Sequence, residues 1–376
     1  MIYFDNAATT RPLQLALKEY EDISATLFAN PSSGHLYGIS AHRKLEQVRD
    51  EMLRLLKLEK THDLIFTSGA SESNNLALKG AARQYANRGK RLITNMGEHS
   101  SVLNPLRALK EEGFEVVFLP ITSDGRVDPE TLRGAMDKST TLVSVMSVNN
   151  EVGSYNDLKA IAEVVHSYPK AYLLVDATQS MGKDDIDLSM ADLISFSAHK
   201  FGGTKGVGAL IYRKNIKLHP EHDGGGQEHG FRSGTVNLAG NAAMAVALRD
   251  SLEHLKENRE MASALKKTVA DGLADVDEVV VNSPEDSSPY ILNISLLHKK
   301  SSVIIEALGE RGIYVSSHTA CDARRSEPSS VLLAMGLSQE RAENSIRISF
   351  SHDNTIQDGV EFVAALKQVI EEVKDR

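Results

Sequence analysis

A lysine follows an apolar run near the middle of the chain. Residues 193–197 have the composition of a buried strand, Lys200 comes shortly after them, and Gly202 and Gly203 follow. A lysine at the end of a buried strand can be partly desolvated, which leaves its amine available to form a bond with a carbonyl carbon. The two glycines would let the backbone approach a ligand closely. Most lysines after strands are solvated, so Lys200 by itself does not identify a site.

Two further segments place polar groups directly after apolar runs. Asp176 ends the run 172–175, where a carboxylate either caps a helix or holds the protonated ring nitrogen of a pyridoxal 5'-phosphate (PLP) cofactor. Residues 67–75 join a strand to a helix, and their N–H groups with the Ser71 hydroxyl could bind a phosphate. This turn lacks the Walker lysine and the GxGxxG spacing, which excludes both nucleotide-loop motifs. A serine-capped helix without a ligand would show the same pattern.

The elements that would position these residues alternate along the chain. Apolar runs of strand length occur at 63–67, 91–95, 115–121, 141–148, 171–177, 193–197 and 208–213. Helical periodicity appears between the first five of them, at 72–87, 102–112 and 158–166. Strands alternating with helices predict a mainly parallel sheet covered on both faces. Because ligands bind at the carboxyl ends of such strands, we expect the polar segments to meet there.

The pattern changes after about residue 236. A helical stretch at 240–273 is followed by strand candidates at 278–282 and 290–296, a helix at 302–310, and a strand at 312–316. A loop with Cys321, a strand at 346–351 and a helix at 355–374 complete the chain. This order predicts a smaller α+β domain after the α/β domain.

Composition restricts the function class. The 376 residues carry a formal net charge of −9, which argues against direct nucleic-acid binding. No apolar run approaches the roughly 20 residues of a membrane span, and Asp5 and Asn6 stand where a signal peptide would be apolar. The count of one cysteine excludes an internal disulfide, and a cytoplasmic location is expected. We expect no metal site.

Short motifs extend almost from end to end. They are YFDNAATT (3–10), NPSSGH (30–35), SGASESNN (68–75), EH (98–99), NNEVG (149–153), VDATQ (175–179), SAHK (197–200), GGQE (225–228), RSGT (232–235), SSHTAC (316–321) and IRIS (346–349). In this order they resemble the class V aminotransferase-type PLP enzymes, and within these the cysteine desulfurases of iron–sulfur-cluster assembly. The resemblance implies the PLP-dependent transferase fold of type I. It has a large PLP-binding domain (14–254) with a mainly parallel seven-stranded sheet, and a small domain (1–13 and 255–376) that carries the cysteine loop.

The resemblance also implies a role for each residue around the PLP ring. Lys200 is similar to the lysine that binds the cofactor covalently and moves the substrate Cα proton. Asp176 resembles the partner of the ring nitrogen, and Gln179 the donor to the ring hydroxyl. His99 resembles an imidazole that stacks on the ring and assists proton transfer.

The phosphate and the substrate have their own implied ligands. Residues matching the phosphate site are Ala70, Ser71, Ser197 and His199. Thr235 resembles a phosphate ligand that a neighbouring subunit contributes, which implies a homodimer. Asn150, beside the cofactor, and Arg347 resemble the clamp on the substrate carboxylate, for which the planar guanidinium is suited.

Cys321 is the expected sulfur acceptor. It lies in a loop of polar and small residues, and Arg324 and Arg325 would favour its thiolate. The branch of the family with a long loop has the same register between the reactive cysteine and Glu327-Pro328, although that loop usually has small residues. Here His318 precedes Cys321 and charged residues follow it, so we hypothesise that His318 tunes the thiol.

The resemblance implies conversion of L-cysteine to L-alanine, with the sulfur carried on Cys321 as a persulfide for an acceptor protein. That acceptor would serve iron–sulfur-cluster assembly, tRNA thiolation or a cofactor pathway. Three alternatives share the motifs: a selenocysteine lyase or related β-lyase, an aminotransferase that needs a 2-oxo acid, and a sulfur-delivery scaffold whose catalysis has decayed. The complete set Lys200, Asp176, His99 and Arg347 argues against the scaffold.

Overall fold

The structure is a computed structural model that describes residues 1–317 and 328–373. Within these ranges the strands form a seven-stranded, a three-stranded and a two-stranded sheet. The seven-stranded sheet, called here the large sheet, has the order β2-β8-β7-β6-β5-β3-β4. Its strands are β2 (His62–Thr67), β3 (Arg91–Asn95), β4 (Glu115–Leu119), β5 (Thr140–Met146), β6 (Tyr172–Asp176), β7 (Leu193–Ser197) and β8 (Gly208–Arg213). The predicted α/β class with a large, mainly parallel sheet is confirmed.

One strand departs from the parallel arrangement. β8 runs antiparallel to both β7 and β2, whereas the other neighbouring pairs are parallel. β5 ends at Met146, short of the predicted residue 148, because Val148 turns away to pair with Tyr155 in an isolated bridge. β4 likewise ends at Leu119, before the predicted residue 121. The polar residues that follow β2, β5, β6 and β7 therefore come to one edge of the sheet.

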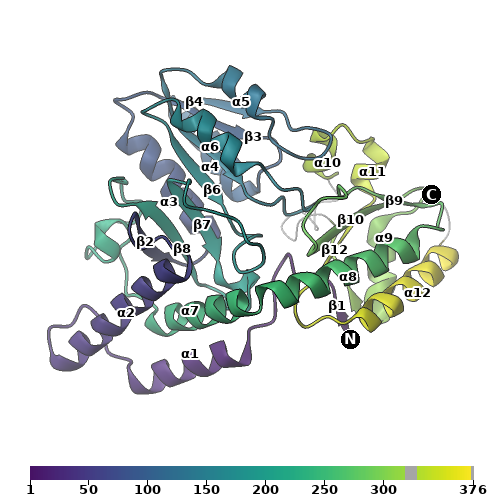
Figure 1. Cartoon of the computed structure of the whole chain (residues 1–376), viewed down its shortest axis with the longest axis horizontal. Helices are drawn as coiled ribbons and strands as arrows, with labels where there is room; N and C mark the ends of the chain where they lie inside the picture. The colour runs from purple at the N-terminus through teal and green to yellow at the C-terminus, as the bar shows by residue number, and fades with distance from the viewer. Residues whose placement is uncertain (318–327, 374–376) are drawn as a thin grey trace.

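Helices cover both faces of the large sheet (Figure 1). On one face α3 (Ala70–Gln84) and α4 (Ser100–Glu111) bury apolar side chains such as Leu76 and Leu106 against the sheet. The helices packed into the core of the opposite face are α1 (Gln14–Thr26), α2 (Leu36–Leu55), α5 (Pro129–Ala135), α6 (Leu158–His166) and α7 (Leu238–Glu253). Such double coverage buries the central strands along their whole length, as the burial of every residue of β5 and β7 shows.

A second group of elements builds the other part of the molecule, on the right in Figure 1. Its three-stranded antiparallel sheet has the order β12-β10-β9, and β1 pairs with β11 in parallel. Its elements are β1 (Ile2–Tyr3), α8 (Leu255–Leu273), β9 (Val279–Val281), β10 (Ile291–Leu296), α9 (Ser301–Glu310), β11 (Ile313–Tyr314), α10 (Ser330–Ala334), α11 (Gln339–Glu343), β12 (Ser345–Ser349) and α12 (Ile356–Glu372). Phe4, Phe350 and Phe362 pack edge to face in its core, so the N-terminal residues pack with this group.

The helical stretch predicted at 240–273 consists of two helices. α7 ends at Glu253 and α8 begins at Leu255, with His254 between them at φ −101° and ψ 13°. The His254 ring lies 2.9 Å from the Asp250 carbonyl oxygen, and this local side-chain contact occurs where the helix is interrupted. α7 and α8 follow one another from left to right across the lower half of Figure 1 and connect the two parts.

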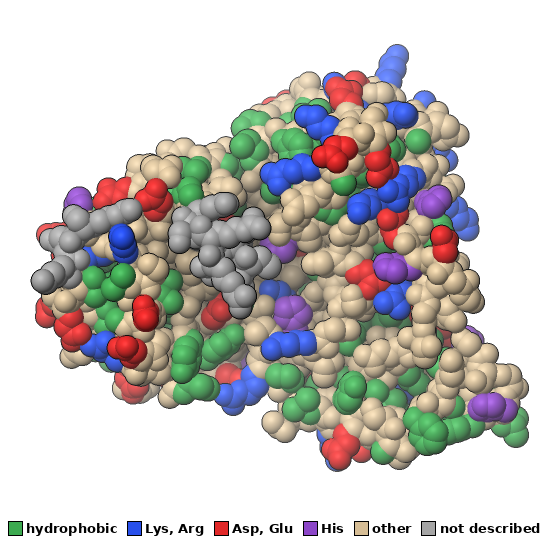
Figure 2. All heavy atoms as spheres, turned by 180° about the vertical axis from the view of Figure 1, so that it is seen from behind, with side chains coloured by type: hydrophobic (Ala, Val, Ile, Leu, Met, Phe, Trp, Pro, Cys, Tyr) green, Lys and Arg blue, Asp and Glu red, His purple; other side chains and the backbone are tan. Residues whose placement is uncertain are grey.

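The back of the molecule shows where the two parts meet. In Figure 2 histidine side chains (purple) and Lys or Arg side chains (blue) gather near the middle of this face.

Among the described residues, none of the helices has both the length and the apolar character that crossing a membrane requires.

Candidate cofactor and substrate site

A cavity of about 230 Å³ lies at the carboxyl ends of the large-sheet strands. Its lining includes nearly all the predicted site residues: Ala70, Ser71, His99, Asn150, Asp176, Gln179, Ser197, His199, Lys200 and Arg347. Residues without a predicted role also line it: Ala7, Ala8, Ser101, Met146, Val148 and Thr178. Segments distant in the sequence meet here because parallel strands end at a common edge.

Lys200 ends a short 3-10 turn (Ala198–Lys200) directly after β7. Its Nζ donates to the backbone carbonyls of Ala7 at 2.5 Å and Ala8 at 2.8 Å. Burial, followed by the positive charges of Arg347 and Lys183, lowers the pKa of Lys200 to about 7. Much of the Lys200 amine is therefore neutral near pH 7, which is the form that acts as a nucleophile or base.

Asp176, at the end of β6, is held by two donors. Asn74 Nδ2 donates to its Oδ2 at 2.8 Å, and the Thr178 backbone N–H donates to its Oδ1 at 2.9 Å. Asn74 itself accepts from Ser195 Oγ at 2.5 Å. The carboxylate therefore has a fixed orientation at the cavity wall, suited to a protonated ring nitrogen.

Gln179 and His99 lie around the same cavity. Gln179 Nε2 donates to the Ala7 carbonyl at 3.0 Å, and its buried Oε1 has no hydrogen-bond partner within the described part of the chain. Such an orphaned acceptor can take the hydrogen of a ligand hydroxyl, whereas the sequence analysis expects Gln179 to donate to that hydroxyl; in the structure its Nε2 is bonded to Ala7 instead. His99 is the N-cap of α4, where its Nδ1 accepts from the Ser101 backbone N–H at 3.1 Å. That bond fixes the orientation of the imidazole ring.

Glu98, beside His99, is a buried carboxyl that the sequence analysis assigned no role. Its Oε1 accepts from Asn95 Nδ2 at 2.7 Å and from the Met146 backbone N–H at 2.6 Å. Burial, with a smaller contribution from the negative charge of Asp176, raises the pKa of Glu98 to about 8. Glu98 is therefore mostly protonated and neutral near pH 7, so it does not place a second negative charge close to Asp176.

The turn before α3 can bind an anion. Ser197 Oγ accepts from the Ala70 backbone N–H at 2.7 Å, which brings β7 against the first turn of α3. A Cβ on Gly208 would come within 2.5 Å of Gly69 Cα, so this packing needs a glycine there. Burial, and then the charge of Lys200, lowers the pKa of His199 to about 4, so His199 is neutral at pH 7.

Arg347 reaches the cavity from β12, in the three-stranded sheet. It is 2% exposed, its Nη1 donates to the Asn150 carbonyl at 3.0 Å, and its Nη2 pairs with Asp5 Oδ1 at 3.0 Å. Its Nε is buried without a hydrogen-bond partner in the described residues. A buried guanidinium with spare donor capacity is suited to a carboxylate ligand.

Comparison with known proteins agrees with this geometry. The Aminotransferase class-V family matches residues 2–362. The chain belongs to this family. A NifS/IcsS protein homolog from Lactobacillus delbrueckii subsp. bulgaricus is 40% identical over 374 residues, which cover 98% of this chain and 97% of that protein. A cysteine desulfurase IscS from Acinetobacter baumannii is 39% identical over 384 residues, with 100% of this chain and 94% of that protein covered.

Two solved structures have the same fold. A NifS-like protein superposes with a TM-score of 0.93 at 34% identity, with 99% of this chain and 100% of that chain covered. DndA from Streptomyces lividans superposes with a TM-score of 0.77 at 35% identity over 93% of this chain and 99% of that chain. The predicted family and fold are therefore confirmed.

PLP is the cofactor of this class-V family, and the cavity residues fit it. Asp176 is placed to pair with a ring nitrogen, and the orphaned Gln179 oxygen can bind a ring hydroxyl. The hydroxyls of Ser71 and Ser197, which line the cavity, offer donors for a phosphate, and Lys200 offers an amine. The donor set therefore matches each polar group of PLP, which bears out the predicted cofactor of this class-V enzyme.

Two predicted site residues are not among the described residues that line the cavity. Thr235 is exposed and does not line the cavity of its own chain, so its predicted role needs a second subunit. Cys321, with His318, Arg324 and Arg325, lies outside the described residues. Their roles stay predictions.

Some residues that contact the predicted site residues had no predicted role. Ala7 and Ala8 belong to the first motif, but nothing local indicates that their carbonyls meet Lys200. Asn74 lies in the motif at 68–75. An amide inside an otherwise apolar helix face was the one sequence feature that could have indicated its contact with Asp176. Among the described residues no cluster of metal-ligating side chains is present.

Proposed function

We propose that the chain is a PLP-dependent cysteine desulfurase, which converts L-cysteine to L-alanine and transfers the sulfur to Cys321 as a persulfide. The observation that carries the proposal is the meeting of three side chains at one cavity. The lowered pKa of Lys200 leaves much of its amine neutral, and hydrogen bonds fix the orientation of Asp176. Arg347 is buried at the same cavity. The names of the class-V relatives, cysteine desulfurase among them, support this activity over a selenocysteine lyase, a transaminase or a scaffold.

Each cavity residue has a task in this proposal. Arg347 and Asn150 bind the substrate carboxylate and orient the Cα–H bond. When bound, PLP supplies a ring that delocalises the electron pair left on Cα. Lys200, as a neutral amine, takes the Cα proton, and Asp176 keeps the ring nitrogen protonated.

The cofactor is held by the remaining residues. Ala70, Ser71, Ser197 and His199 would bind the phosphate, and Gln179 the ring hydroxyl. His99 would stack on the ring and assist proton transfer. Thr235 of a second subunit would complete the phosphate site, which requires a homodimer.

Sulfur transfer completes the reaction. The Cys321 thiolate attacks the substrate sulfur, so an S–S bond forms as the Cβ–S bond breaks. The electron pair of the broken bond passes to the three-carbon fragment, which is protonated and leaves as alanine. His318, Arg324 and Arg325 would adjust the reactivity of Cys321. The persulfide would then pass to an acceptor protein of the iron–sulfur-cluster or tRNA-thiolation type, or to a thiol reductant.

Alanine release from L-cysteine in the presence of a thiol reductant tests the proposal. Wild type should release alanine, and Cys321→Ser should release little while it retains the absorbance of bound PLP. Equal release from both proteins would indicate a lyase that does not use Cys321. Release by neither protein, with PLP bound, would contradict desulfuration and indicate a transaminase or a scaffold.

A further inference from the structure

The residues just before Thr235 adopt a costly backbone conformation. Glu228 has φ 49° and His229 has φ 58°, both in the left-handed region that non-glycine residues avoid. Such a conformation is unfavourable for a residue with a side chain and persists only where its surroundings hold it. Something must therefore hold residues 226–234, called here the 226–234 segment, in place.

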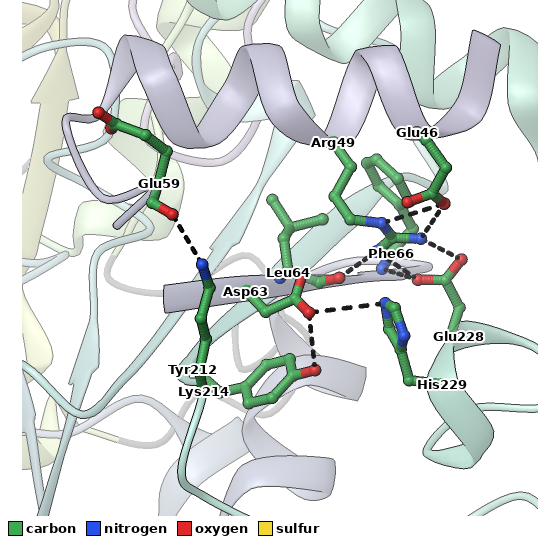
Figure 3. A network of polar contacts seen from close by, with 10 residues as sticks. All are labelled: Glu46, Arg49, Glu59, Asp63, Leu64, Phe66, Tyr212, Lys214, Glu228 and His229. Carbon is green, nitrogen blue, oxygen red and sulfur yellow. Dashed lines mark hydrogen bonds and ion pairs between the residues drawn. The ribbon is translucent and has the colours of Figure 1, made fainter. Parts of the chain in front are cut away.

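A buried ion pair holds the segment at Glu228 (Figure 3). Arg49, from α2, and Glu228 lie 3.1 Å apart between Nη1 and Oε2, with side chains 5% and 2% exposed. Both also bind the backbone of β2: Glu228 Oε2 accepts from the Phe66 N–H at 2.8 Å, and Arg49 Nη1 donates to the Leu64 carbonyl. The pair thus connects α2, β2 and the 226–234 segment.

Further contacts fix the segment on both sides of the pair. His229 lies 3.8 Å from Asp63, and the Phe231 ring meets Tyr212 edge to face. Arg232 pairs with Glu72 of α3 at 2.7 Å. Because Gly234 N–H donates to Gln227 Oε1 at 3.0 Å, the segment is also closed on itself directly before Thr235.

A buried ion pair is a weak way to gain stability, because desolvating two charges offsets most of their attraction. The pair does require that both side chains stay in place, because removing one partner leaves a buried charge unpaired. Arg49 and Glu228 together bind backbone atoms of β2 and fix one conformation of a strained segment. The residue that this arrangement presents, Thr235, is exposed and outside the cavity of its own chain.

We propose that Arg49 and Glu228 are positioning residues for PLP binding in the other subunit: they fix the 226–234 segment so that Thr235 reaches the phosphate site of a second copy of the chain. This inference rests on the proposed function, in which Thr235 is a phosphate ligand across a homodimer. Arg49 and Glu228 themselves touch neither cofactor nor substrate.

The first measurement is the affinity of the apoprotein for PLP, followed by the absorbance of the lysine-bound cofactor. Glu228→Gln keeps the side-chain shape and removes the charge, and should weaken PLP binding about tenfold or more, as should Thr235→Ala. Glu112→Gln, which breaks the exposed pair with Arg83, is the matched control and should leave the affinity unchanged. An unchanged affinity in Glu228→Gln overturns the inference.

Mixed dimers distinguish positioning across the dimer from general damage. A Glu228→Gln chain paired with a Lys200→Ala chain has one site that can bind PLP covalently, and that site receives Thr235 from the chain with the intact ion pair. It should bind PLP with wild-type affinity. A chain with both substitutions paired with wild type should instead show the weakened affinity, because its altered segment serves the remaining site. The reverse pattern, or weakening in both, overturns the inference.

The same dimers with Thr235→Ala test the proposed function separately. If Thr235→Ala weakens the site of its own chain, the donation of Thr235 across the dimer is wrong. If Thr235 acts across the dimer and Glu228 does not, only the positioning role fails. Should Glu228→Gln not fold, Arg49→Lys, which keeps the charge and changes the hydrogen-bonding geometry, takes its place with the same expected pattern.

Discussion

Asn74 donates a hydrogen bond to Asp176 at 2.8 Å, although the two residues come from different elements, α3 and β6. Because Asn74 also accepts from Ser195 Oγ, its amide has a fixed orientation between β7 and the carboxylate. The carboxylate that would pair with the cofactor ring is therefore oriented by an amide outside the predicted site residues.

Replacing Asn74 should weaken this support. Asn74→Ala leaves Asp176 Oδ2 without its side-chain donor, and we expect kcat for alanine release to fall about tenfold while KM changes little. Steady-state kinetics and the absorbance spectrum of bound PLP measure this. Asn75→Ala is the control, since Asn75 is half-buried, does not line the cavity, and its side chain donates to the Ser71 carbonyl of its own helix. If Asn74→Ala still binds the cofactor through Lys200 and keeps the wild-type kcat, the proposed role of Asn74 in orienting Asp176 is contradicted.

Lys200→Ala should abolish the absorbance of lysine-bound PLP. No other lysine lines the cavity within the described residues, so no substitute amine is at hand. Absorbance spectra after incubation with excess PLP check this. Lys205→Ala, which removes an exposed lysine close by in the sequence, should leave the spectrum intact. An unchanged spectrum in Lys200→Ala would remove Lys200 from its role.

The pH dependence of PLP capture reports the pKa of Lys200. The neutral amine is the reactive form, so the rate of covalent binding to the apoprotein should rise with pH through about 7 instead of through the ordinary lysine value of 10.5. Burial is the largest cause, the charges of Arg347 and Lys183 add to it, and those of Asp5 and Asp176 oppose it. Arg347→Met should therefore move the midpoint to higher pH. A wild-type midpoint near 10 would show that Lys200 is not desolvated.

Arg347→Lys should affect substrate binding more than cofactor binding. A lysine keeps the charge but loses the planar pair of donors, so KM for L-cysteine should rise about tenfold or more while the PLP spectrum stays close to wild type. Arg341→Lys, at an arginine that bonds Asn282 away from the cavity, provides the control. If KM were unchanged in Arg347→Lys, the carboxylate would bind elsewhere.

Glu98→Gln should change the pH dependence of stability. The pKa of Glu98 is raised from 4.5 to about 8, so the folded chain holds a proton that the unfolded chain releases between these values. Wild type should therefore lose up to about 1.4 kcal/mol of unfolding free energy for each pH unit of that window from this group. Glutamine mimics the protonated acid and lacks this loss. Urea unfolding at pH 5 and pH 8 should show the variant gaining on wild type at the higher pH, and parallel changes in both proteins would contradict the assignment.

Local patterns predicted much of the fold. The strands 91–95, 193–197 and 208–213 and the helix 158–166 have the predicted bounds, because each is an apolar or periodic run ended by polar residues. α2 was not predicted, and one reason is that the buried Arg49 places a charge in its apolar face. The antiparallel direction of β8 has no signal in a single strand, since it depends on pairing with β7 and β2.

The site residues also divide into those that the sequence could predict and those that it could not. Residues that directly follow strands, such as Asp176 and Lys200, could be placed together from the topology of parallel sheets. The contact of Lys200 with Ala7 and Ala8 could not, because it joins positions almost 200 residues apart in the sequence, where Thr10 also bonds the His199 carbonyl. Glu98 could not be recognised either, since its burial is a property of the folded molecule.

The ion pair of Arg49 and Glu228 has a further consequence for solubility. β2 is the terminal strand of the large sheet, and the pair occupies the Leu64 carbonyl and the Phe66 N–H along it. Unpaired groups on a terminal strand are a template on which strands of other chains can add, which leads to aggregation. The pair therefore shields the sheet from self-association, and the shield forms only when α2 and the 226–234 segment have docked.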